Sequence, residues 1–178
     1  HRFHQCQDII LSKFHAEVLS LNSAPVETPD VFLTYYDLDG IPDMVLDRFK
    51  TYCKGHRIRI YGDRECENFL YRVYGAKYAD HFTKFKTLAH KADFWRYCVL
   101  CYYGGYYFDI KTRLIKHISE VFNLNLSSKN WCTSLCVPTI QNCIYNGFIA
   151  SPPGNPALLL AIDHMFTNIN TGGYLRYV

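Results

Sequence analysis

The chain has 178 residues, of which 20% are charged and 49% hydrophobic, and its formal net charge is +3. This length fits one domain that is large enough to bury a core, and so small a charge does not point to a nucleic-acid partner. No stretch approaches the roughly 18 consecutive apolar residues of a membrane-spanning helix. The aromatic share of 16% fits a binding cleft and a core equally well.

The amino-terminal part predicts a helix that precedes the main domain. Segment 8–21 carries apolar residues at helical spacing, and the two prolines of segment 22–29 indicate a linker. We therefore divide the chain into an amino-terminal helix and linker, 1–28, and one domain, 29–178, which we expect to continue beyond Val178.

Helical and strand patterns then alternate along the domain. Pro42 stands near the first turn of one helix, Asp63 is predicted to cap the next, and Gly75 stands where that helix ends. Thr87 and Gly104 bracket a longer apolar helix. The predicted strands are 31–36, 56–63, 106–110 and 143–151, and the predicted helices are 41–53, 64–75, 88–103 and 157–166. This alternation predicts an α/β fold with a mostly parallel sheet flanked by helices, which binds ligands at the carboxyl ends of its strands.

The largely apolar helix 88–103 contains the charged residues Asp93 and Arg96. Asp93 and Arg96 are three positions apart, so they share one face and can form an ion pair. A surface ion pair is one interpretation. Because the rest of the helix is apolar, the alternative is a polar rim on an interior helix, where charges are rare without a task or a partner.

The stretch YYGGYYFDIK, 102–111, places a Gly-Gly pair between that helix and the third strand. The glycines end the helix and let the backbone turn sharply. Alternation along the strand puts Tyr107, Asp109 and Lys111 on one face. We expect Asp109 and Lys111 to emerge at the carboxyl end of the strand, within reach of Asp93 and Arg96; the alternative is that Asp109 is an ordinary turn residue.

The chain has eight cysteines, and their spacing raises the question of zinc or disulfides. The pairs Cys98/Cys101 and Cys132/Cys136 resemble zinc ligands loosely, which leaves a zinc-stabilised interaction domain as one alternative. Cys98 and Cys101 lie inside an apolar helical run, where free cysteine acts as a small buried hydrophobe.

The segment KADFWRYCVLCYYGGYYFDIK, 91–111, resembles the core of the DXD-containing glycosyltransferases of family 32. That family has the approximate pattern K-x-D-x-x-R, an apolar helix and then G-G-x-Y-x-D-x-D. Its members include α-1,6-mannosyltransferases, α-1,4-galactosyltransferases and capsular-polysaccharide enzymes. Three more segments, 29–42, 57–70 and 146–162, resemble the family in the same order.

The resemblance implies a GT-A fold, which is Rossmann-like, and transfer of a hexose from a UDP- or GDP-sugar to a hydroxyl of a glycan or glycolipid, with retention of configuration. It implies that Asp93 and Arg96 hold the sugar hydroxyls and the diphosphate side of the donor. It places Tyr107 beside the donor, makes Asp109 the first aspartate of the motif, and brings Asn146 to the sugar.

The resemblance also assigns the segment from Phe32 to Tyr36 to the nucleobase pocket. Leu33 and Thr34 stand where the family has a His-Gln pair. At these two positions the chain therefore departs from the family's contacts to the nucleobase. Relatives in eukaryotes work in the Golgi lumen, whereas viral and bacterial ones work in the cytoplasm, so the location stays open.

A second departure concerns the metal, because Lys111 stands where the family has its second aspartate. Three alternatives follow. Lys111 itself supplies the positive charge that the leaving diphosphate needs. Alternatively, Mn²⁺ or Mg²⁺ is held by Asp109, the donor phosphates and water. The third alternative is a catalytically weakened or inactive module that binds nucleotide sugars or glycans.

Overall fold

The computed structural model describes residues 28–121, 133–136 and 144–171, and the predicted amino-terminal helix therefore lies outside the described residues. Five strands form one sheet in the order β2-β1-β3-β5-β4. They are β1 (Val31–Thr34), β2 (Ile58–Tyr61), β3 (Gly105–Phe108), β4 (Thr133–Cys136) and β5 (Ile144–Ser151). β1 pairs in parallel with β2 and β3, whereas β5 runs antiparallel to both β3 and β4. Four strands thus run in one direction, and the predicted α/β fold with a mostly parallel sheet is confirmed.

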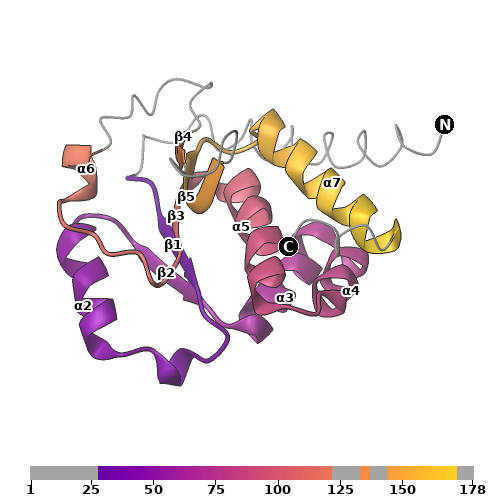
Figure 1. Cartoon of the computed structure of the whole chain (residues 1–178), viewed down its shortest axis with the longest axis horizontal. Helices are drawn as coiled ribbons and strands as arrows, with labels where there is room; N and C mark the ends of the chain where they lie inside the picture. Colours follow the sequence, from indigo (N-terminus) through magenta and orange to yellow (C-terminus); the bar gives the residue numbers. More distant parts are fainter. Residues whose placement is uncertain (1–27, 122–132, 137–143, 172–178) are drawn as a thin grey trace.

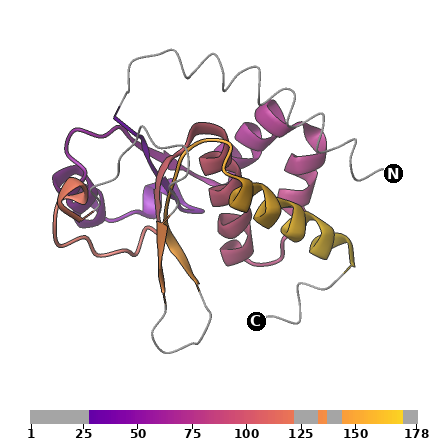
Figure 2. The same cartoon turned by 90° about the horizontal axis from the view of Figure 1, so that it is seen from above.

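Helices cover both faces of this sheet (Figure 1). They are the 3-10 turn η1 (Leu38–Gly40) and the helices α2 (Asp43–Tyr52), α3 (Asp63–Tyr74), α4 (Ala76–Lys84), α5 (Leu88–Tyr103), α6 (Ile118–Val121) and α7 (Pro156–Thr171). Helices α3, α4, α5 and α7 lie on one side, and α2 and α6 lie on the other, which Figure 2 shows from above. The domain therefore has three layers.

Two hydrophobic cores lie between the sheet and the helices on its two sides. The first joins Phe32 and Tyr107 of the sheet to α3, α4, α5 and α7. The second joins Val31, Leu33 and Phe108 to α2 and α6. Neighbouring strand residues alternate between the two cores because side chains in a strand point to opposite faces. Both faces of the central strands are apolar, as expected for a covered sheet.

The ends of α5 follow the sequence prediction. Thr87 Oγ1 accepts a hydrogen bond from His90 N at 3.2 Å, and Gly104 closes the helix with φ of 66°. Gly105 has φ of 107°, and a Cβ there would lie 2.5 Å from Asp30 O. The Gly-Gly pair is thus required both by its backbone angles and by the close approach of the chain that enters β1.

Several boundaries differ from the prediction. Asp63 is the first residue of α3, and Gly62 is the N-cap, whose N–H donates to Glu65 Oε2 at 3.1 Å. β3 ends at Phe108, so Lys111 lies in a turn instead of on the face of the strand. That turn is closed by a 2.8 Å hydrogen bond from the amide of Thr112 to the carbonyl of Asp109. The helices α4 and α6 and the strand β4 were not predicted, because they are short or follow a turn residue directly.

Four cysteines in the described residues, Cys53, Cys66, Cys98 and Cys101, are free and buried. Burial raises the pKa of the Cys98 thiol well above its ordinary value. The prediction that Cys98 and Cys101 act as buried hydrophobes is confirmed, whereas Cys132 lies outside the described residues. Among the helices of the described ranges, none combines the length and the apolar character needed to cross a bilayer.

Candidate functional site

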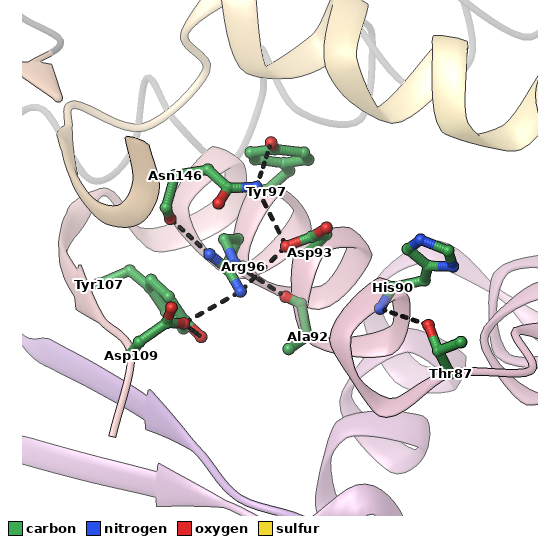
Figure 3. Close-up of polar contacts among 9 residues, drawn as sticks. All are labelled: Thr87, His90, Ala92, Asp93, Arg96, Tyr97, Tyr107, Asp109 and Asn146. Atoms are coloured by element: carbon green, nitrogen blue, oxygen red, sulfur yellow. Dashed lines mark hydrogen bonds and ion pairs between the residues drawn. The ribbon is translucent and has the colours of Figure 1, made fainter. Parts of the chain in front are cut away.

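The buried side chain of Arg96, on α5, is the centre of a polar network at the carboxyl end of β3 (Figure 3). Its Nε donates to Ala92 O at 3.2 Å, and its Nη1 donates to Asn146 O. Its Nη2 lies 3.0 Å from Asp93 Oδ1 and 3.1 Å from Asp109 Oδ1. All three nitrogens of the guanidinium are thus engaged, and one side chain ties α5 to the ends of β3 and β5.

The two carboxylates of this network each have one committed oxygen. Asp93 Oδ1 also accepts from Asn146 Nδ2 at 3.0 Å, and Asp109 Oδ1 also accepts from Tyr107 Oη at 2.9 Å. In the described part of the chain, neither Oδ2 atom receives a hydrogen bond or ion pair. Because ionised carboxylates only accept, these two oxygens suit hydroxyl groups or a cation.

The charges of the network sum to −1, since Asp93 and Asp109 face a single guanidinium. Burial raises the pKa of Asp93; the Arg96 charge lowers it, and the Asp109 charge raises it further. Burial also raises the pKa of Tyr107 well above its ordinary value, so this phenol stays neutral and donates to Asp109. A negatively charged site repels a bare diphosphate unless a positive group offsets the negative charge.

Aromatic residues hold the network in place. The guanidinium carbon of Arg96 lies 4.5 Å from the centroid of the Tyr107 ring. Asn146 Nδ2 also donates to Tyr97 Oη at 3.4 Å. The sequence prediction did not include Tyr97, although its place four residues after Asp93 puts both on one helix face.

The residues expected at the nucleobase pocket separate into buried and exposed ones. Phe32 and Leu33 have no exposed surface, and they point into opposite cores. Tyr36 is 55% exposed, and its ring centroid lies 4.7 Å from that of Tyr35. The base pocket stays a prediction, and of Phe32, Leu33 and Tyr36, Tyr36 is the one whose side chain is exposed to solvent.

Lys111 is exposed in the turn after β3 and is not part of the Arg96 network. The hydrogen bond with Tyr35 is the main cause that raises the pKa of Tyr36, and the charge of Lys111 lowers that pKa. Tyr36 follows the end of β1 and Lys111 follows the end of β3, and these strands pair in parallel, so both residues lie at the carboxyl edge of the sheet. This edge is where α/β folds bind ligands.

The residues present suit a divalent cation only if a bound ligand also supplies phosphate oxygens to it. Within the described ranges, no group of three or more His, Cys, Asp or Glu residues is placed to hold a metal ion. Asp109 Oδ2 is a hard oxygen on a side chain that is 37% exposed. Magnesium sites often use one or two carboxylates together with substrate phosphates, so Asp109 suits that kind of site.

The fold and this edge define an α/β domain with a carboxylate-rich candidate ligand site, and comparisons with known proteins indicate its class. Residues 60–131 match the family described as "Glycosyltransferase sugar-binding region containing DXD motif". That range contains Asp93, Arg96, Tyr107, Asp109 and Lys111. At the position of the motif this chain reads Asp-Ile-Lys.

The chain is also similar to a protein of Acanthamoeba polyphaga mimivirus that is named "Uncharacterized glycosyltransferase L373". The two are 27% identical over 116 residues, which is 65% of this chain and 45% of that protein. The chain thus spans less than half the length of this relative. No solved structure matches. Together, the two matches support a sugar-binding region of the DXD glycosyltransferase type.

Proposed function

We propose that this domain transfers a hexose from a UDP- or GDP-sugar to a hydroxyl of a glycan or glycolipid, with retention of configuration. The observation that carries the proposal is the convergence of Asp93, Asp109 and Asn146 on the buried Arg96. Asp93, Arg96 and Asp109 lie inside the region that matches the sugar-transferase family. The comparisons do not favour the alternative of an inactive binding module.

Each residue has a role that follows from its contacts. Asp93 and Asp109 present their Oδ2 atoms to the hydroxyls of the sugar. Arg96 holds both carboxylates in position, because its nitrogens are already engaged within the protein. Tyr36 packs against the base. No side chain needs to act as a covalent nucleophile, since the donor phosphate accepts the proton of the acceptor hydroxyl, and the protein positions the reactants.

The leaving diphosphate needs a positive partner, and the chain offers two solutions. Asp109 would hold a Mn²⁺ or Mg²⁺ ion together with the donor, and the ion would supply positive charge to the leaving group. Lys111, exposed in the turn after β3 at the same edge of the sheet, offers its ammonium for the same purpose. The two solutions differ in their response to a chelator.

The test measures nucleotide release from UDP- and GDP-sugars with Mn²⁺ and, separately, with EDTA. The variants are Asp109→Asn, Lys111→Asp and, as a matched control, Lys116→Asp, which changes an exposed lysine farther along the same connection. We expect turnover in the wild type, a loss of about 100-fold or more in Asp109→Asn, and little change in Lys116→Asp.

The metal response then separates the two solutions. If turnover requires Mn²⁺ and Lys111→Asp leaves that requirement unchanged, the cation at Asp109 carries the charge. If turnover survives EDTA, and Lys111→Asp either abolishes it or makes it depend on Mn²⁺, Lys111 carries the charge. If the protein binds nucleotide sugars but turns over none of the panel, the proposed transferase activity is contradicted. The protein would then be a binding module for nucleotide sugars.

A further inference from the structure

Both hydrogens of the Asn146 side-chain amide are committed within the protein. Its Nδ2 donates to Asp93 Oδ1 at 3.0 Å and to Tyr97 Oη at 3.4 Å, and the amide lies between these two partners in Figure 3. Arg96 holds the backbone of the same residue, because its Nη1 donates to Asn146 O. The residue that β5 contributes to the Arg96 network is therefore fixed both at its backbone and at its side chain.

The two partners of the amide control different aspects of its orientation. Asp93 decides which end of the amide faces α5, because a reversed amide would bring Oδ1 against a carboxylate oxygen, and neither atom can donate. Tyr97 limits the rotation of the amide, since the terminal torsion of asparagine is broad and a single hydrogen bond leaves the amide free to turn. The Tyr97 ring packs against the first core. Burial raises the pKa of Tyr97, so the phenol stays neutral and adds no charge to the network.

This arrangement leaves two acceptor oxygens open on neighbouring groups, Asn146 Oδ1 and Asp93 Oδ2. Neither receives a hydrogen bond from a residue in the described ranges. The buried side-chain atoms that lack a hydrogen bond in these ranges belong to other residues, so both oxygens are accessible to solvent. The side chain of Asp93 is 23% exposed. A ligand can therefore reach the two oxygens without displacing a protein donor.

Two acceptors side by side select the chemistry of the ligand. The amide oxygen and the ionised carboxylate only accept hydrogen bonds, so the ligand must donate to both. Hydroxyl groups do so, and a hexose carries them on neighbouring carbons. A phosphate oxygen does not match, since it also only accepts and carries a charge of the same sign as Asp93.

We propose that Tyr97 is a positioning residue, which holds the Asn146 amide so that its Oδ1 binds a sugar hydroxyl beside the one bound by Asp93 Oδ2. Tyr97 acts through Asn146 and does not need to touch the ligand. This inference rests on the proposed function, because it assumes that the ligand beside Asp93 is a sugar.

Calorimetric titration tests the inference with UDP-glucose, UDP-galactose and GDP-mannose, and with UDP and GDP as probes that lack the sugar. The variant Tyr97→Phe keeps the packed ring and removes the oxygen that accepts from Asn146. The matched control is Tyr103→Phe, which changes a tyrosine of the same helix that is 40% exposed. We expect Tyr97→Phe to weaken the binding of the preferred sugar nucleotide about fivefold, and to leave the binding of UDP or GDP unchanged. Tyr103→Phe should change neither.

A double-mutant cycle then shows whether Tyr97 acts through Asn146. Asn146→Ala removes the amide and keeps the backbone carbonyl that accepts from Arg96, and we expect it to weaken the sugar nucleotide about tenfold. In this background, Tyr97→Phe should cause no further loss, because the amide that it positions is absent.

Three results overturn this inference alone. They are an unchanged affinity in Tyr97→Phe, an equal loss for sugar nucleotide and bare nucleotide, and a loss that is the same with and without the Asn146 amide. The last would mean that Tyr97 affects binding independently of Asn146. A wild-type protein that binds none of the probes contradicts the proposed function itself.

Discussion

Two groups of ion pairs lie at opposite ends of the parallel strands, and each consists of three charges. At the amino end, Asp30 is shared by Arg57 at 2.8 Å and by Arg59 at 2.7 Å. At the carboxyl end, Arg96 is shared by Asp93 and Asp109. The first group has one carboxylate between two arginines, and the second has one arginine between two carboxylates.

The difference lies in burial and in what each group leaves open. Both oxygens of Asp30 are occupied, and the Arg57 side chain is 62% exposed, so this group joins the starts of β1 and β2. The Arg96 side chain is 4% exposed, and the two carboxylates that it holds each keep one oxygen without a protein partner in the described ranges. Similar charged residues therefore form a structural link at one edge and a candidate ligand site at the other.

The largest effect should come from removing the buried charge. Arg96→Ala leaves Asp93 and Asp109 without their counter-ion, and we expect a loss of about 3–5 kcal/mol in the free energy of unfolding. Arg57→Ala, the control at the other edge, removes an exposed pair and should cost less than about 1 kcal/mol. Urea denaturation measures both. Equal losses would mean that the two groups do not differ as described.

A smaller effect should come from the glycine beside the amino-end group. Gly105→Ala combines a positive φ with a Cβ that would lie 2.5 Å from Asp30 O, and we expect it to cost about 3 kcal/mol. Gly55→Ala is the matched control, because its φ of 91° is similar and nothing lies within 4 Å of its Cβ. It should cost about 1 kcal/mol. Thermal melting compares them, and a Gly55 variant that is destabilised as much as the Gly105 variant would assign the whole cost to the backbone angle.

The smallest effect concerns the pH dependence of stability at the carboxyl end. Burial raises the pKa of Asp93 in the folded protein, so its carboxyl contributes stability that is present below the ordinary carboxyl pKa of about 3.9 and is lost as pH rises through the raised value. Relative to Asp93→Asn, the wild type should therefore become less stable as pH rises above about 4. Urea denaturation from acidic to neutral pH checks this, and a difference that grows in the opposite direction would show that Arg96 outweighs burial.

Local sequence patterns were enough to predict most of the secondary structure. Thr87 and Gly104 were predicted to delimit α5, and the structure confirms both, because a cap and a positive-φ glycine act through neighbouring residues. The alternation of strands and helices predicted the fold class for the same reason. The pairing of Asp93 with Arg96 was also predictable, since residues three apart on a helix are neighbours.

The tertiary structure decided how the candidate site is assembled. Asp109 meets Arg96, and Asn146 meets Asp93, across 13 and 53 positions of sequence, and such contacts depend on how β3, β5 and α5 pack. The antiparallel direction of β5 brings Gly147 and Tyr145 to Asp109, and no periodicity in the strand itself reveals its partner. The early end of β3 moves Lys111 into a turn, because the hydrogen bond from Thr112 closes the backbone there. The sequence by itself thus determined most of the elements and the polar residues on them, because these depend on neighbouring residues, whereas long-range packing decided which oxygens remain open to a ligand.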